Sequence, residues 1–336
     1  MSPVAEDCGL VGVNWGSARL RAYRVSGDGR VLDEVDAPTG VAGLDRPGMA
    51  AVMDELVERW PGHGPIYACG MVGSNIGWVE APYAAAPASA ADLIRAAEPT
   101  RIGGADVLVV PGVACRRAFD GAPDVMRGEE VELLGLAALK PGFDGLVAMA
   151  GAHTKWVRVR SGRVSDFLTS MSGEIFDRLT AAGLLASVVE GEAADGPAFL
   201  DGVAAGRARR LGLAGLLFGA RARVLRGDLE RLDAASYVRG LLIGSEIADA
   251  AAMHPDLAGS EVLLVGGEAL CRLYGSALRS VGADASRHDA REACVRGFSA
   301  LHAVVPEPPK PPTARTRQEA AKPVRSTKGM EMEHEA

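Results

Sequence analysis

Two short stretches of the chain carry residues that could hold phosphate groups. The first, VNWGSARLR, spans residues 13–21, and the second, MAGAHTKWV, spans residues 149–157. Each follows an apolar run and combines a glycine turn, small or hydroxyl residues and a basic residue, before a second strand and a Ser-Gly turn. Backbone N–H groups exposed in such turns bind anions. Two copies of one β-hairpin unit therefore predict duplicated domains that face each other across a cleft and hold a nucleotide between them.

The two turns contain the residues that we expect to contact the phosphates of the nucleotide. The predicted phosphate ligands are Gly16, Ser17, Gly151, His153, Thr154 and Lys155. Lys155 follows a glycine turn, which favours phosphate binding over the alternative of a plain surface lysine. His153 could instead be a structural residue of the turn, because one histidine without a known partner is weak evidence for chemistry.

Phosphoryl transfer also needs a carboxylate that positions or deprotonates the attacking hydroxyl group. Glu129 and Glu130 are the predicted catalytic residues. On a helix, Glu130 shares a face with leucines three and four positions later, where a glutamate is costly unless it has a partner or a role. The alternative is that both glutamates complement the dipole at a helix N-terminus. Glu174 is open to the same two interpretations.

A third glycine pair can hold the nucleoside. Gly266 and Gly267 lie between a predicted strand and a predicted helix, and a helix N-terminus of this kind can pack against adenosine. An ordinary tight turn is the alternative, and only the two phosphate turns favour the nucleotide interpretation. The chain has neither a P-loop motif nor a Gly-x-Gly-x-x-Gly motif that opens a helix, so those two nucleotide-binding classes are excluded.

Composition narrows the class of protein further. The 336 residues, 48% of them hydrophobic, suffice for two cores. The formal net charge of −7 argues against a general nucleic-acid binder. Five scattered cysteines indicate reduced thiols, with no zinc site or disulfide framework. Without a signal peptide or an apolar run of roughly 20 residues, the sequence predicts a soluble cytoplasmic protein, and a homo-oligomer is left open.

Short strands joined by helices must position these turns. The pattern predicts strands at 9–13, 19–25, 30–34, 65–69, 107–111 and 261–265, and helices at 47–60, 124–139, 173–185, 198–225, 237–253 and 268–280. The glycine- and proline-rich stretch 73–87 reads as a loop. The predicted domains are 1–144, with the first phosphate turn, and 145–305, with the second turn and the adenosine site. The proline-rich tail 306–336 is expected to be disordered.

Five ordered motifs resemble one family. NWGS at 14–17, GMVGSNIGW at 70–78, VMRGEE at 125–130, GAHTKWV at 151–157 and MSGE at 171–174 are similar to 2-dehydro-3-deoxygalactonokinase, over about residues 9–304. The resemblance implies an α/β fold of two duplicated actin/ribonuclease H-like domains around a central cleft. It also implies ATP- and Mg²⁺-dependent phosphorylation of the terminal (6-) hydroxyl of 2-dehydro-3-deoxy-D-galactonate in galactonate breakdown.

A sugar acid carries a carboxylate, so its site should contain an arginine that can bind it through two hydrogen bonds. Arg127 is the predicted residue, with Arg21 as the reserve. The predicted substrate site also includes Met71, Ser74 and Asn75, and Trp78 either walls the pocket or anchors its loop.

The sequence departs from the family pattern at the phosphate turns. Asn14 stands where the family has aspartate, so we expect Asn14 to reach Mg²⁺ only weakly, through water. Ala18, Ala150 and Ala152 also replace the usual residues. A kinase-fold protein that binds ATP or the sugar acid without turnover is therefore the alternative function, and a phosphatase or nucleotidase is a third.

Overall fold

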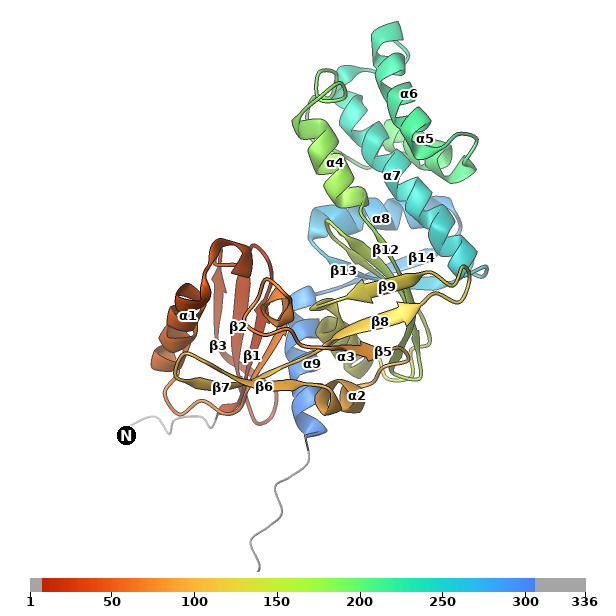
Figure 1. Ribbon diagram of the computed structural model, residues 1–336. Coiled ribbons are helices and arrows are strands. Elements are labelled where there is room, and N and C mark those ends of the chain that lie inside the picture. The colour runs from red at the N-terminus through yellow and green to blue at the C-terminus, as the bar shows by residue number, and fades with distance from the viewer. Residues whose placement is uncertain (1–7, 306–336) are drawn as a thin grey trace, which may run out of the picture. The chain divides into compact units, whose positions relative to one another are not determined.

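The computed structural model describes residues 8–305, and residues 8–304 belong to one compact unit (Figure 1). The tail predicted at 306–336 lies outside the described residues. Strands β1–β14 and helices α1–α9 form three sheets with helices packed against them, which is a mixed α/β fold.

The first sheet has six strands in the order β3-β2-β1-β4-β7-β6. Its strands are β1 (Cys8–Trp15), β2 (Leu20–Ser26), β3 (Val31–Ala37), β4 (Ile66–Gly70), β6 (Glu98–Ile102) and β7 (Ala105–Val109). All were predicted to within a few residues except β6, the edge strand. A 3-10 turn, η1 (Val41–Gly43), precedes α1 (Arg46–Arg59), where the Asp45 side chain accepts a hydrogen bond from the Gly48 N–H and so begins the helix.

The second sheet repeats this topology in the order β12-β11-β10-β13-β14. Its strands are β10 (Gly145–Ala150), β11 (Thr154–Arg160), β12 (Arg163–Ser170), β13 (Glu261–Gly266) and β14 (Asp284–His288). In both sheets the first strand pairs antiparallel with the second and parallel with the fourth, and the third lies antiparallel beside the second. The duplicated α/β fold predicted from the two hairpins is confirmed.

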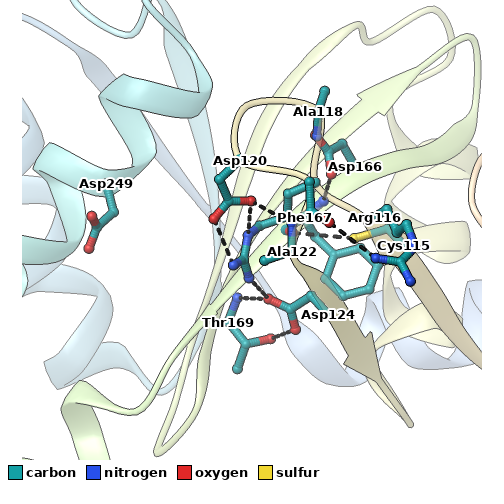
Figure 2. Close-up of polar contacts among 12 residues, drawn as sticks. Cys115, Arg116, Ala118, Asp120, Ala122, Asp124, Asp166, Phe167, Thr169 and Asp249 are labelled. Carbon is teal, nitrogen blue, oxygen red and sulfur yellow. Dashed lines mark hydrogen bonds and ion pairs between the residues drawn. The ribbon is translucent and has the colours of Figure 1, made fainter.

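A small third sheet joins β5 (Tyr83–Ala85), β8 (Gly112–Arg116) and β9 (Pro123–Met126). The helix predicted at 124–139 is wrong over its first part, because α3 begins at Glu129 (Glu129–Leu139). The reason lies in Asp124, whose carboxylate accepts hydrogen bonds from both the N–H and the hydroxyl of Thr169 (Figure 2). It also accepts one from Arg117. These long-range contacts hold 123–126 as a strand against β12. The predicted loop 73–87 likewise contains β5, after η2 (Met71–Gly73), and α2 (Ala90–Arg95) follows it.

The last helix, α9 (Ala290–Ala303), returns to the first half of the chain and packs against α3 (Figure 1). Glycines allow this close approach. A Cβ atom added to Gly135 of α3 would lie 1.7 Å from the Ala293 carbonyl oxygen, and one added to Gly297 would lie 1.9 Å from that of Val131. The two helix backbones are therefore in direct contact.

Four helices lie between β12 and β13: α4 (Ser172–Ala181), α5 (Pro197–Ala208), α6 (Leu213–Arg226) and α7 (Arg231–Met253). The predicted helix 198–225 is two helices, because Arg209 adopts a left-handed conformation and ends α5. The predicted helix 173–185 ends at Ala181. Helix α8 (Glu268–Ser280) follows β13 as predicted. Across residues 8–305, no helix is long and apolar enough to span a membrane.

Candidate active site

A cavity of about 600 Å³ lies where the ends of β2, β10 and β13 meet the beginnings of α3 and α9. Its lining includes Arg21, Tyr23, Glu129, Glu132, Gly151, Ala152, His153, Gly266, Gly267 and Asp289. Six of the predicted site residues are thus brought together here from distant parts of the chain: the reserve arginine Arg21, one carboxylate, two residues of the second phosphate turn and the glycine pair.

The second turn, between β10 and β11, has an open side at Gly151. A Cβ atom added there would meet no other atom within 4 Å, so the glycine leaves room beside the turn. The Glu174 N–H, in α4, donates to the Ala152 carbonyl oxygen at 3.0 Å. The Glu174 carboxylate lies 2.7 Å from His153 Nε2, and this hydrogen bond lowers the pKa of Glu174. His153 is therefore held at the rim of the cavity by α4.

Thr154 is fully buried and does not line the cavity. Its hydroxyl oxygen lies 2.8 Å from the Tyr274 hydroxyl and accepts a hydrogen bond from the Gly151 N–H at 3.4 Å. The Thr154 side chain thus supports the turn from below.

Lys155 joins the second turn to α3. Its Nζ lies 3.1 Å from Glu129 Oε1 and donates to the His153 carbonyl oxygen at 3.2 Å. The Lys155 side chain is only 7% exposed and that of Glu129 is 29% exposed. The alternative of a plain surface lysine is therefore wrong, since water does not surround this ammonium group.

The two predicted catalytic glutamates occupy different surroundings. Glu129 lines the cavity and also accepts a hydrogen bond from the Arg127 N–H at 3.1 Å. Glu130 is fully buried, and its Oε2 accepts from the Gly128 N–H at 2.6 Å. Burial, and then the neighbouring Glu129 charge, raise the pKa of Glu130 to about 8. Gly128 has a φ of 110°, a conformation that favours glycine, so Glu130 braces the turn that begins α3.

The cavity contains two further carboxyl groups that the sequence patterns did not identify. Burial, and then the neighbouring Glu129 charge, raise the pKa of Glu132 to about 8, while Arg21 opposes the shift. Its spacing of three residues from Glu129 was the available signal, because such residues share a helix face. Asp289 accepts a hydrogen bond from the Glu292 N–H at 2.8 Å and so begins α9. That position follows β14, a strand that was not predicted.

The first turn lies outside the cavity lining. The Gly16 N–H donates to the Arg19 carbonyl oxygen at 2.8 Å, its own carbonyl oxygen accepts from Val41, and Ser17 is exposed. Asn14 is the penultimate residue of β1, and its Nδ2 lies 3.8 Å from the Cys294 sulfur. A Cβ atom on Gly70 would lie 3.4 Å from Asn14 Oδ1, so the amide oxygen points toward the end of β4.

The predicted substrate residues gather around the loop that follows β4. Arg127 Nη2 donates to the Ala81 carbonyl oxygen at 2.8 Å, and the guanidinium stacks 4.3 Å above the Tyr83 ring. Among the described residues, its buried Nε and Nη1 have no hydrogen-bond partner. The Ser74 hydroxyl donates to the Met71 carbonyl oxygen at 2.7 Å, and Asn75 is exposed.

Trp78 anchors this loop. Its backbone N–H donates to the Val72 carbonyl oxygen at 2.8 Å, and the Arg46 guanidinium stacks 4.9 Å from the centre of the Trp78 ring.

The duplicated sheets, with a glycine-lined cavity whose Glu129 carboxylate pairs with the buried Lys155, define the class as a sugar kinase of the actin-like fold. The chain belongs to the 2-keto-3-deoxy-galactonokinase family, whose model matches residues 14–301. A Rhizobium meliloti protein named 2-dehydro-3-deoxygalactonokinase DgoK1 is 38% identical over 293 residues, covering 86% of this chain and 94% of the relative. The 2-dehydro-3-deoxygalactonokinase of Escherichia coli K12 is 33% identical over 276 residues, which cover 82% of this chain and 90% of that protein.

A solved structure agrees with this membership. The crystal structure of a Sinorhizobium meliloti protein assigned as a 2-dehydro-3-deoxygalactonokinase is similar to this chain with a TM-score of 0.80 and 37% identity. The similarity covers 87% of this chain and 97% of that one. The family resemblance inferred from the five motifs is therefore confirmed.

Proposed function

We propose that the protein transfers the terminal phosphoryl group of ATP to the 6-hydroxyl of 2-dehydro-3-deoxy-D-galactonate. The observation that carries the proposal is the Lys155–Glu129 ion pair, which joins a buried cation of the phosphate turn to a carboxylate of α3 that lines the cavity. Phosphoryl transfer needs both, a positive charge for the phosphate oxygens and a carboxylate for the hydroxyl. The relatives' names supply the sugar acid.

The nucleotide would occupy the cavity with its phosphates beside Gly151, His153 and Lys155 and its adenosine beside Gly267, where α8 begins. Gly267, like Gly151, has open space where a Cβ atom would lie. Thr154 supports this turn from below, and Gly16 and Ser17 would complete the phosphate site only if the first turn approaches the nucleotide when it binds.

We assign the proton-accepting role to Glu129 and a positioning role to Glu130. Glu129 lines the cavity, so the sugar hydroxyl can reach its carboxylate. The same carboxylate is ion-paired with Lys155. As Lys155 turns toward the phosphoryl oxygens, Glu129 gains the hydroxyl proton. Glu130 is buried and holds the Gly128 turn, which fixes where Glu129 lies.

The sugar acid would lie against the loop after β4, with its carboxylate on Arg127. The Nε and Nη1 atoms of Arg127 are buried without a partner among residues 8–305, and leaving charged donors unpaired is costly. A substrate carboxylate would accept a hydrogen bond from one of them. Met71, Ser74 and Asn75 would contact the sugar chain, and the exposed Asn75 amide is free to approach it.

The cavity also fits Mg²⁺. The Glu132 carboxylate in the cavity lining is a hard oxygen donor of the kind Mg²⁺ prefers, Asn14 Oδ1 outside the lining is another, and Mg²⁺ usually keeps several waters. These residues would hold the ion, with Asn14 contributing weakly through water. The bound ion would neutralise charge on the phosphate oxygens.

We further infer a cytoplasmic enzyme of galactonate breakdown whose two domains, 1–144 and 145–305, close over the substrates. In the described residues, α9 packs on α3, so the C-terminal helix would move with the first half of the chain. Small-angle scattering should show compaction when ATP and the sugar acid are both present, and an unchanged profile would count against closure.

A coupled assay of ADP release tests the proposal, with Mg²⁺, ATP and either the galactonate or the gluconate epimer. We expect sugar-dependent turnover, and at least a 10²-fold loss in Glu129→Gln. Sugar-independent ATP hydrolysis, or no turnover with either epimer, would contradict a kinase. The family match covers nearly the whole chain and so favours the kinase over a binding protein without turnover.

A further inference from the structure

A buried carboxylate lies beneath the second phosphate turn, on a helix that has no residue in the cavity lining. Glu246 of α7 is 2% exposed. Its Oε2 accepts hydrogen bonds from the Tyr274 hydroxyl at 2.7 Å and from Trp156 Nε1 at 3.1 Å. Its Oε1 accepts one from the Ser172 hydroxyl. The carboxylate is thus satisfied by three neutral donors and has no ion-pair partner among the salt bridges of residues 8–305.

These three donors come from the three elements that surround the turn: α8, β11 and α4. On one side, the Tyr274 hydroxyl lies 2.8 Å from the Thr154 hydroxyl, which in turn accepts a hydrogen bond from the Gly151 N–H. The Thr154 hydroxyl also lies 3.3 Å from the Gly151 carbonyl oxygen, to which it donates, so this side chain contacts both polar backbone atoms of Gly151. A continuous chain of hydrogen bonds therefore runs from Glu246 to the turn.

Ser172 fixes the turn from the other side. The next residue, Gly173, packs so closely that an added Cβ atom would lie 2.4 Å from the Gly151 carbonyl oxygen. The Glu174 N–H then donates to the Ala152 carbonyl oxygen. By holding Ser172, Glu246 sets where the beginning of α4 meets the backbone of 151–152.

We propose that Glu246 is a positioning residue, which holds the turn at 151–154 in its phosphate-binding shape through Tyr274 and Thr154 on one side and Ser172 on the other. The inference rests on the proposed function in one respect: that this turn receives the phosphates of ATP. Burying a carboxylate is costly unless its lone pairs are satisfied, and hydrophobic residues of similar volume would pack the same site at less cost. The network secures a particular backbone geometry, and placement errors of about 1 Å cost roughly 10²-fold in rate.

Tyr274→Phe is the sharpest test, because it removes only the hydroxyl group that links Glu246 to Thr154. The control is Tyr67→Phe in β4, whose hydroxyl makes one 2.8 Å hydrogen bond, to His302, away from the cavity, whereas the Tyr274 hydroxyl makes two. We expect Tyr274→Phe to raise the KM for ATP about fivefold, in line with one hydrogen bond, and to leave the KM for the sugar acid within twofold. Tyr67→Phe should change neither constant.

Hydrogen exchange of the protein without ligands provides a readout independent of activity. The amides of 151–155 should exchange several times faster in Tyr274→Phe and in Glu246→Leu than in the wild type or in Tyr67→Phe. Glu246→Gln should keep the wild-type protection, because its amide oxygen still accepts from Tyr274 and Trp156 while its NH₂ group donates to Ser172.

Two results would overturn the positioning role. One is that the amides of 151–155 exchange equally fast in Tyr274→Phe and Tyr67→Phe. The other is that Tyr274→Phe raises the KM for ATP and the KM for the sugar acid by the same factor. If the wild type shows no turnover, the proposed function fails, and the exchange comparison still decides whether Glu246 holds the turn.

Discussion

Replacing Gly151 by alanine separates phosphate binding from stability. An added Cβ atom would meet no atom within 4 Å, and the residue lines the cavity, so the new methyl group would project into the space we assign to the phosphates. Alanine also has fewer backbone conformations than glycine in the unfolded chain, so less conformational entropy is lost on folding. We therefore expect the free energy of unfolding to stay constant or rise by about 0.5–1 kcal/mol.

The effect on catalysis should be large. A methyl group displaces the phosphate from the turn by about 1 Å or more, which costs roughly 10²-fold in kcat/KM for ATP, or about 2.7 kcal/mol. Gly173→Ala gives the opposite combination. Its Cβ atom would lie 2.4 Å from the Gly151 carbonyl oxygen, so the substitution must move backbone and lower the melting temperature.

The assay combines thermal unfolding with ATP saturation curves at fixed sugar acid. Gly27→Ala is the control, since it also adds a methyl group in open space, but at an exposed turn of the first hairpin. Wild-type kcat/KM for ATP in Gly151→Ala would refute the reasoning, as would a melting temperature that falls as far as in Gly173→Ala.

Three further predictions concern the sugar acid, the metal and pH. Arg127→Lys loses the planar pair of donors, so the KM for the sugar acid should rise 10- to 100-fold while the KM for ATP stays unchanged. An equal rise in both KM values would contradict the assignment of Arg127 to the substrate carboxylate. Asn14→Asp restores a charged oxygen, so half-maximal activity should need several-fold less Mg²⁺; an unchanged requirement would mean that the ion is held elsewhere. Burial, and then the Arg158 charge, lower the pKa of His254 from 6.5 to about 4, so the native state keeps this ring neutral and stability is lost as pH falls from 6.5 toward 4. Measured by urea unfolding, the free energy of unfolding of the wild type should fall by about 2 kcal/mol more than that of His254→Gln between pH 7 and pH 5. Equal decreases in the two proteins would refute the role of His254.

Local patterns in the sequence were enough to predict the duplicated fold. Each hairpin is built from neighbouring strands with glycine turns between them, so the signal for β1–β3 and β10–β12 lies within about 30 residues of chain. Two of the missed strands, β6 and β14, carry polar residues at the edges of their sheets and show no clear alternation. The strands of the small third sheet, β5, β8 and β9, were missed as well. The error at 124–126 arose because the Asp124 carboxylate accepts a hydrogen bond from Thr169, which lies 45 positions later in the chain.

The same distinction applies to the candidate site. The positions of Gly151, of the Gly266–Gly267 pair and of Glu129 at the cavity could be predicted, because their motifs are short and continuous, whereas the first turn lies outside the cavity lining. Asp289 and Glu246 could not, since their importance depends on contacts between elements far apart in the chain, such as the Thr154–Tyr274 hydrogen bond that spans 120 positions. Packing of α7 and α8 against the second sheet creates those contacts, and no local periodicity encodes them.

Phosphorus NMR of a reaction with ATP, Mg²⁺ and 2-dehydro-3-deoxygalactonate tests the central claim most directly. The account predicts a new phosphomonoester resonance that couples to the protons on C6 and grows in step with ADP. Inorganic phosphate in its place would indicate a phosphatase or nucleotidase, and an unchanged ATP spectrum, with the ligands still raising the melting temperature, would indicate a binding protein without turnover.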